Sequence, residues 1–340
     1  MFRKILIAAA FAAMALSCGY ESRNEEVVDV ILETDMGNDI DDALTLALAY
    51  NYVESGKMNL LAVCLNKDGY GPAEFVDIMN TFYGHPEVPI GIIRGGAECD
   101  GAVNYARIVS EMKTGDGTPL FSRTVPDCNE LPEAHNLYRR ILSSRPDNSV
   151  VIVSVGFSTN LIKLLETRAD EYSDLNGRDL VARKVRKLVV MAGNFEDPGF
   201  YEYNVKMDVP SAKIIFETWP TPLVASPFEL GIQTCYPATS IANDFLWSSQ
   251  NPLVEAYKSY LQMPYDRPMW DPTALLYAVE GETWFTMSES GKIRVTDEGA
   301  TIFMSDPQGN RRYMKVNPDQ AGRIVGHVVG LIPFVPASRQ

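Results

Sequence analysis

The sequence predicts an α/β domain built on a mainly parallel β-sheet that is flanked by helices. Continuous runs of Val, Ile and Leu recur along the chain, and amphipathic helical patterns separate most of them. Strands that are apolar on both faces are typical of a parallel sheet covered on both sides. With 340 residues and 46% hydrophobic content, the chain is long enough for one large domain with a sizeable core.

The elements follow one another in a regular alternation. We expect six buried strands at Val27–Leu32, Leu60–Leu65, Val88–Ile93, Val150–Val155, Lys187–Met191 and Pro222–Ala225. A helical pattern begins at Ala43, and further helices are expected at Ala73–Tyr83, Glu133–Leu142, Asn160–Thr167 and Ser211–Thr218. Because ligands of such sheets bind at the carboxyl ends of the strands, the loops that follow each strand are where a site is expected.

The C-terminal part has a different pattern. Helices near Ile241–Gln262 and Thr273–Val279 precede three short strands, and a final helix is expected over Pro318–Val329. The expected strands are Lys292–Val295, Thr301–Met304 and Arg312–Val316. We interpret them as a small β appendage on the same domain.

Residues 1–18 have the pattern of a secretory signal, in which basic residues precede an apolar run too short to span a bilayer. Cys18 follows a small residue as in a bacterial lipoprotein box. We therefore expect an exported protein, either anchored to the membrane by a lipid on Cys18 or cleaved near Ser17 and periplasmic. Residues 19–26 then form a tether, and 27–340 form one domain.

The net charge of -14 argues against nucleic-acid binding, which requires a basic patch. It also leaves the lipid on Cys18 as the expected route to a membrane. An acidic chain suits a cation site and an uncharged small-molecule substrate. Export permits a disulfide among Cys99, Cys128 and Cys235, which the spacing alone does not establish.

Four aspartates crowd the turn between the first strand and the helix after it, namely Asp35, Asp39, Asp41 and Asp42. Neighbouring carboxylates raise one another's pKa, so this many require a cation or a strong set of donors. Ca²⁺ prefers such oxygen ligands. Helix capping would explain one or two of them. An EF-hand is excluded because the central Gly and the terminal Glu are absent. A strand–Asp-x-Asp phosphatase would place its nucleophile on Glu33.

This segment resembles the opening of the inosine–uridine-preferring nucleoside hydrolase family, which reads Asp-x-Asp-Pro-Gly-x-Asp-Asp-Ala. Glu33 and Met36 replace the first Asp and the Pro, and Asp39 belongs to an insertion of two residues. Polar residues after later strands keep a similar order as far as about Val279. The resemblance implies a Rossmann-like nucleoside hydrolase fold and a homo-oligomer.

Position by position, the resemblance implies a Ca²⁺ cofactor bound by Asp35, Asp42, Asp271 and the backbone carbonyl of Val155. Asp35 would also be the catalytic base. The implied substrate-binding residues are Asp41, Asn66, Asn194, Glu202, Asn204 and Trp270. The implied reaction is calcium-dependent hydrolysis of the N-glycosidic bond of ribonucleosides to free base and ribose. It would pass through an oxocarbenium-like transition state, with metal-bound water as the nucleophile.

Trp270 stands where many members of the family place the His that protonates the leaving base. Trp270 could instead stack on an aromatic base, while Arg267, Tyr201 or Tyr203 supplies a proton or a hydrogen bond. Two alternatives therefore stay open. One is a calcium-containing lipoprotein that binds a ribosyl or related sugar without turnover, and the other is a hydrolase of a different glycoside.

Lys67 is unexpected beside a pocket for a neutral sugar. It either points away and pairs with Asp68, or contacts an anionic substituent of the substrate. An exposed Lys–Asp pair contributes at most about 1 kcal/mol to stability.

Overall fold

The computed structural model describes residues 27–97, 103–197 and 199–340. The signal segment, Cys18 and Cys99 lie outside these residues, so the predicted lipid anchor stays a prediction. The thiols of Cys64, Cys128 and Cys235 are free. Within the described ranges, no helix has both the length and the apolar character needed to cross a membrane.

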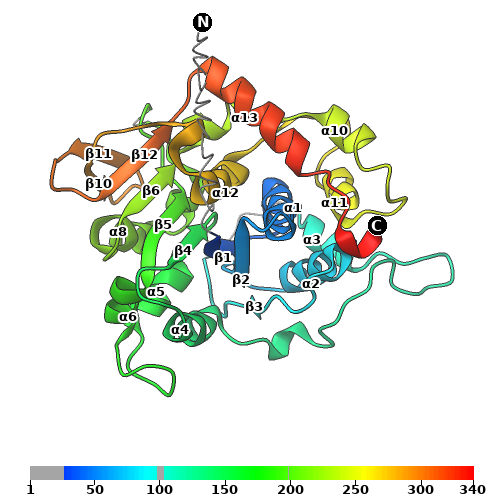
Figure 1. Ribbon diagram of the computed structural model, residues 1–340, viewed down its shortest axis with the longest axis horizontal. Helices are drawn as coiled ribbons and strands as arrows, with labels where there is room; N and C mark the ends of the chain where they lie inside the picture. The colour runs from blue at the N-terminus through cyan, green and yellow to red at the C-terminus, as the bar shows by residue number, and fades with distance from the viewer. Residues whose placement is uncertain (1–26, 98–102, 198) are drawn as a thin grey trace, which may run out of the picture.

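Ten strands in the described part of the chain form one sheet, in the order β11-β10-β12-β6-β5-β4-β1-β2-β3, with β9 paired to β12 (Figure 1). Every pairing between the neighbours from β3 to β6, and that of β6 with β12, is parallel. The six predicted strands are β1 (Val28–Thr34), β2 (Met58–Leu65), β3 (Ile90–Gly91), β4 (Val150–Ser154), β5 (Val185–Met191) and β6 (Leu223–Ser226). The predicted parallel sheet is thus confirmed.

The order of the first six strands, 3-2-1-4-5-6, is the doubly wound order of Rossmann-like folds. From β1 the chain builds the sheet outward through β2 and β3, then returns to β4 on the other side of β1. This reversal leaves a crevice beyond the carboxyl ends of β1 and β4, where such folds bind ligands. The Val155 amide donates to the Glu33 carbonyl oxygen at 2.8 Å and so joins the two strand ends.

Helices cover both faces of the sheet and bury two separate apolar clusters (Figure 1). One face carries α1 (Asp41–Glu54), α2 (Pro72–Tyr83), α3 (Tyr105–Ser110), α11 (Pro252–Tyr260), α12 (Trp270–Glu280) and α13 (Pro318–Leu331). The other face carries α4 (Ala134–Ser144), α5 (Thr159–Glu166), α6 (Gly177–Lys184) and α8 (Val209–Thr218). Helix α1 packs against β2, α2, α11 and α12, and this position explains why it is apolar on nearly all sides.

Short elements complete the connections between these layers. They are α7 (Tyr203–Met207), α9 (Phe228–Gly231), α10 (Ala238–Asn243), β7 (Cys235–Tyr236), β8 (Arg267–Pro268) and β9 (Thr286–Met287). The helix expected over Ile241–Gln262 is wrong as one element, because it is divided between α10 and α11. Pro252 begins α11, and the Asn251 side chain caps it by accepting from the Leu253 amide at 2.9 Å.

The small C-terminal β appendage is confirmed, and it continues the main sheet. It consists of β10 (Gly291–Val295), β11 (Thr301–Ser305) and β12 (Arg311–Lys315). Strand β12 pairs in parallel with β6, and β10 and β11 follow in antiparallel order. The appendage therefore covers an edge that β6 would otherwise expose.

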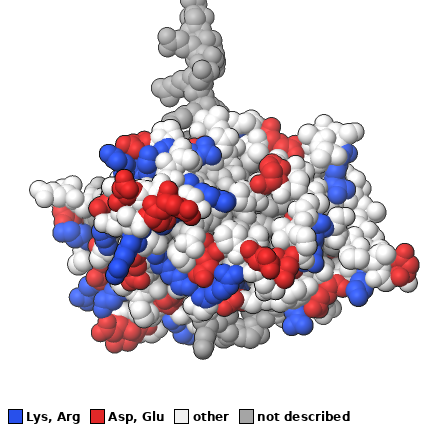
Figure 2. Space-filling model, turned by 90° about the horizontal axis from the view of Figure 1, so that it is seen from below, with Lys and Arg blue, Asp and Glu red and all other residues white. Residues whose placement is uncertain are grey.

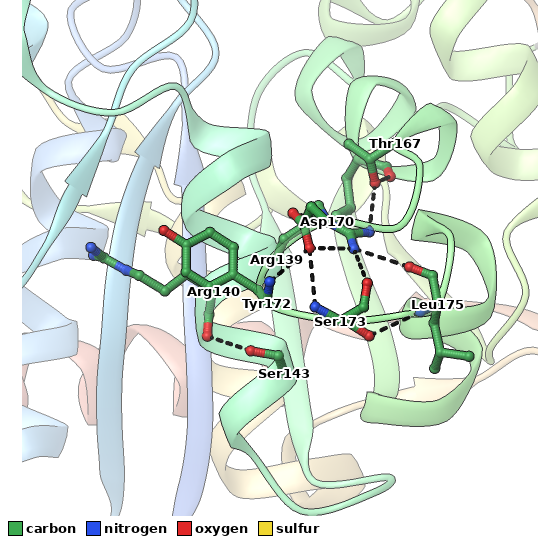
Figure 3. Close-up of polar contacts among 9 residues, drawn as sticks. Arg139, Arg140, Ser143, Thr167, Asp170, Tyr172, Ser173 and Leu175 are labelled. Carbon is green, nitrogen blue, oxygen red and sulfur yellow. Dashed lines mark hydrogen bonds and ion pairs between the residues drawn. The ribbon is translucent and has the colours of Figure 1, made fainter.

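A buried arginine fastens the connection between α5 and α6 (Figure 3). Arg139 on α4 is 1% exposed and donates to both carboxylate oxygens of Asp170, at 2.6 and 2.8 Å. It also donates to the Thr167 hydroxyl and to the carbonyl oxygens of Ser173 and Leu175. These hydrogen bonds hold the connection against α4. Helix α5, which precedes the connection, begins only a few residues after the end of β4.

The surface shown in Figure 2 carries both signs of charge. Lys and Arg side chains intermingle with Asp and Glu side chains over that face. The acidic excess of the chain, -14, is therefore not gathered there into one field that would steer a charged partner.

Candidate active site

A pocket with a volume of about 290 Å³ opens at the crevice between β1 and β4. Segments far apart in the chain meet there, from the turn after β1 to the start of α12. The predicted site residues that line it are Asp35, Asp41, Asp42, Val155, Glu202, Asn204, Trp270 and Asp271. Residues that the family resemblance implied, and that the sequence separates by more than 200 positions, therefore line one pocket.

The carboxylates of this pocket come from three places in the fold. Asp35 lies in the turn after β1, Asp41 and Asp42 begin α1, and Asp271 begins α12. Aspartate is favoured at a helix N-terminus because its charge complements the helix dipole. These side chains are nevertheless almost completely buried, with exposures of 1% for Asp41 and Asp42 and 4% for Asp271. Capping alone does not require such burial.

Hydrogen bonds satisfy only part of this cluster. Thr34 Oγ1 donates to Asp42 Oδ1, and the Asp271 amide donates to Asp41 Oδ2 at 3.0 Å. The second oxygen of Asp42, Oδ2, is buried and accepts no hydrogen bond from any described residue. A buried carboxylate oxygen without a donor is costly, so a bound cation is the fitting partner.

The electrostatics of the cluster point in the same direction. Burial raises the pKa of Asp35 to about 6. Burial, reinforced by the charges of Asp35 and Asp41, raises the pKa of the Asp42 carboxyl. The pKa values of the Asp41 and Asp271 carboxyls are raised too, again chiefly by burial. A divalent cation would offset these costs and keep the carboxylates ionised.

The donor set fits a hard cation. Asp35, Asp42, Asp271 and the Val155 carbonyl offer only oxygen atoms, the ligands that Ca²⁺ prefers. No three or more His, Cys, Asp and Glu side chains of the described residues form a ready-made metal cage. The candidate ligands thus line one pocket, but their side chains do not stand in the arrangement of a metal-binding group.

Glu202 and Asn204 form another wall of the pocket. The Glu202 carboxylate accepts from the amides of Gly193, Asn204 and Val205 at 2.8 to 3.1 Å, and burial raises its pKa to about 7. Asn204 Nδ2 donates to the carbonyl oxygens of Met191 and Val155 at 3.0 and 3.3 Å. This wall is therefore fixed to the ends of β5 and β4.

Asn66 and Asn194, predicted to contact substrate, are not among the described residues that line the pocket. Asn66 is fully buried, and its Nδ2 donates to Glu33 Oε1 at 3.2 Å and to the Phe157 carbonyl at 2.9 Å. The Asn194 side chain accepts from the amides of Glu196 and Asp197 and so caps its own turn. Sugar contacts from these two residues stay predictions.

Glu33, which replaces an aspartate of the family pattern, has a structural reason for its extra length. Its Oε2 accepts from the Tyr138 hydroxyl on α4 at 2.7 Å, while Oε1 accepts from Asn66. Burial raises the pKa of Glu33 to about 7. The longer side chain thus links the base of the pocket to a helix on the far face of the sheet.

Phe228, Tyr260 and Trp270 form an aromatic wall of the same pocket, and the sequence indicated only Trp270 among these three. The Phe228 and Trp270 rings stack with centroids 5.5 Å apart, and Trp270 Nε1 donates to the Phe228 carbonyl at 3.0 Å. The Cζ atom of the Arg267 guanidinium lies 5.2 Å from the centroid of the Trp270 ring and 5.1 Å from the centroid of the Tyr260 ring. Phe228 lies two residues after the end of β6 and could have been found there. Tyr260 ends a distant helix and carries no such signal.

A family model described as inosine-uridine preferring nucleoside hydrolase matches residues 30–321. The chain belongs to this nucleoside hydrolase family. The match covers every residue of the candidate site. The members are N-glycosyl hydrolases, so nucleoside hydrolysis is the general activity of the chain.

Solved nucleoside hydrolases share this fold at low sequence identity. A purine-preferring ribonucleoside hydrolase from Gardnerella vaginalis has 18% identity and a TM-score of 0.68, with 90% of this chain and 100% of that chain covered. A plant nucleoside hydrolase has 18% identity and a TM-score of 0.65, with 89% and 99% covered.

A third similar structure is the type III effector protein XopQ, solved with adenosine diphosphate ribose. It has 15% identity and a TM-score of 0.61, with 91% of this chain and 95% of that chain covered. No curated protein sequence matches the chain. At these identities the structural matches establish the fold.

Proposed function

We propose that this nucleoside hydrolase is calcium-dependent and cleaves ribonucleosides to free base and ribose, with purine nucleosides preferred. The observation that carries the proposal is the geometry of the pocket. A buried carboxylate cluster, in which Asp42 Oδ2 accepts no hydrogen bond from a described residue, lines the same pocket as the stacked rings of Phe228 and Trp270. The first surface suits a cation with ribose hydroxyls, and the second suits a flat base.

Asp35, Asp42, Asp271 and the Val155 carbonyl would hold the Ca²⁺. When bound, the ion supplies positive charge that orients water and ribose hydroxyls. Asp35 then acts as general base and removes a proton from the attacking water. Asp41 accepts hydrogen bonds from ribose hydroxyls. The buried carboxylates stabilise the positive charge that develops on the sugar as the N-glycosidic bond breaks.

Trp270 stands before Asp271, and no histidine is among the described residues that line the pocket. The Trp270 indole is held by its bond to the Phe228 carbonyl and by the Arg267 guanidinium. Stacking on such a wall favours bases with a large aromatic face. This is the physical reason for the proposed preference for purines, because the larger ring system of a purine would stack over more area than that of a pyrimidine.

Release of ribose from inosine, guanosine, uridine and cytidine, measured with excess Ca²⁺, tests the proposal. Asp35→Asn should reduce kcat by about 10²- to 10⁴-fold, the usual contribution of a general base. Asp116→Asn is the matched control, because Asp116 lies in an exposed loop. Full activity of Asp35→Asn would contradict the proposed mechanism, and faster turnover of uridine than of inosine would contradict the purine preference.

Binding without turnover is a second candidate. XopQ, whose fold is similar, was solved with adenosine diphosphate ribose, and Trp270 here takes the place of a leaving-group acid. Calorimetric binding of that ligand without any release of base or ribose from nucleosides would favour this candidate over hydrolysis. A hydrolase of another glycoside would be recognised by sugar release from that glycoside alone.

We also propose export, a lipid on Cys18 and a homo-oligomer. The basic and apolar pattern of residues 1–18 supports the first two. Mass spectrometry of the mature N-terminus would detect the lipid. Light scattering of protein lacking residues 1–18 would give the number of subunits, and a monomer would contradict the third.

A further inference from the structure

Asn38 and Asp39 are the two residues that this chain has in addition to the family pattern of the turn after β1. Their side chains contact different neighbouring segments. Asp39 accepts from Arg267 on β8, with Arg267 Nε 2.8 Å from Asp39 Oδ1. Asn38 is 6% exposed, lines the pocket and bonds to Asp35 and Lys67. The insertion is therefore part of the architecture of the pocket.

The Asn38 amide connects a carboxylate to an ammonium group. Its Nδ2 donates to Asp35 Oδ2 at 2.6 Å, and its Oδ1 accepts from Lys67 Nζ. These partners determine the orientation of the amide, because a carboxylate only accepts and an ammonium only donates. An Asp at this position would place a second carboxylate against Asp35, and an Ala would remove both bonds.

Lys67 does not pair with Asp68. The Asp68 carboxylate accepts from the amides of Gly69 and Gly95, at 2.7 and 2.8 Å, while Lys67 turns towards Asn38. Lys67 is also not among the described residues that line the pocket. The predicted pair with Asp68 is therefore wrong. Lys67 reaches the site through its hydrogen bond to Asn38, and a contact with an anionic substituent of the substrate stays a prediction.

We propose that Lys67 and Asn38 are positioning residues that hold Asp35 Oδ2, so that Asp35 Oδ1 is directed at the cation and the attacking water. This inference rests on the proposed function. Groups that hydrogen-bond to metal ligands orient them, and their loss typically costs 10- to 100-fold in metal affinity or activity. Lys67 can hold the Asn38 amide because it lies in the loop after β2. Strand β2 pairs with β1, so this loop lies beside the turn that carries Asn38.

Calorimetric titration with Ca²⁺ and nucleoside kinetics at saturating Ca²⁺ test the inference. Lys67→Met and Asn38→Ala should weaken Ca²⁺ binding by about 10- to 100-fold. In Lys67→Met, kcat should fall while KM changes little, because Lys67 does not touch the pocket. Lys67→Arg should restore most of both, since it keeps the charge and the donors. Lys213→Met, which removes an exposed lysine on α8, is the matched control.

A double mutant distinguishes positioning from general support of the fold. If Lys67 acts through Asp35, Lys67→Met should cost no further Ca²⁺ affinity in the Asp35→Asn background. Wild-type Ca²⁺ affinity in Lys67→Met, or equal losses in both backgrounds, would overturn the inference. Ca²⁺ binding without ribose release would reject hydrolysis while the titrations still decide the role of Lys67. A wild-type protein that binds no Ca²⁺ would overturn both.

Discussion

Replacing Gly156 by Ala should damage catalysis through contact with the backbone of the site. Gly156 follows Val155 at the end of β4. A Cβ atom there would lie 2.6 Å from Asn66 Oδ1, 2.7 Å from the Asp35 amide nitrogen and 2.8 Å from Asp35 Cβ. Ordinary van der Waals contacts begin near 3.4 Å, so the turn after β1 must move by about 0.7 Å. The backbone of Asp35 cannot swing aside as a flexible side chain would.

The expected loss follows from that displacement. A misplacement of about 1 Å costs about 10²-fold in rate, so Gly156→Ala should reduce kcat for inosine by about 10- to 100-fold. Overpacking should also lower the free energy of unfolding by about 1–3 kcal/mol.

Steady-state kinetics and urea unfolding measure the two effects. Gly322→Ala on α13, where a Cβ meets no atom within 4 Å, is the control and should keep wild-type activity. If Gly156→Ala kept the wild-type kcat, the close packing of Asp35 against β4 would not matter for the reaction.

Two further predictions concern the aromatic wall and the buried arginine. Gly231→Ala would place a Cβ 2.0 Å from the Trp270 ring, so Trp270 must move, and KM for inosine should rise about tenfold more than KM for uridine in parallel assays. Asp170→Asn should lower the free energy of unfolding in urea by about 2 kcal/mol, because it removes the charge partner of Arg139, and unchanged stability would refute this. The hydrogen bond from Arg139 lowers the pKa of Asp170 to about 2, below its unfolded value, so this stabilisation is present above about pH 4 and is lost as the pH falls towards 2. The wild type should therefore lose its advantage over Asp170→Asn across that range.

The sequence predicted the site residues that lie next to the end of a strand or the start of a helix. The turn after β1 carries four aspartates, and polar residues follow β4 and precede α12. A parallel sheet brings such ends to one edge, which predicted where a site lies, and the family resemblance then selected Asp35, Asp42, Val155 and Asp271, which line one pocket. The parallel core was predictable because its strands are apolar on both faces.

Contacts between distant segments were not predictable in this way. Tyr260 reaches the pocket from the end of α11, and Arg267 pairs with Asp39 across more than 200 residues. Nothing in the local pattern marks either contact. The hydrogen bond from Asn66 to Glu33 is another contact between separate segments that the local pattern does not show.

The continuation of the sheet by β12 depends on an open edge at β6, which a pattern of short strands does not show. The division of Ile241–Gln262 was readable in principle, because Pro252 with a preceding Asn is a start signal for a helix.

The most direct test of the account is the release of reducing sugar from inosine by protein lacking residues 1–18, with Ca²⁺ present, after chelation, and after Ca²⁺ is restored. The account predicts ribose and free base in equal amounts, loss of release on chelation, and recovery when Ca²⁺ is returned. Release that continues unchanged after complete removal of Ca²⁺ would contradict the metal site. No release from any nucleoside by protein that retains Ca²⁺ would contradict the proposed hydrolysis.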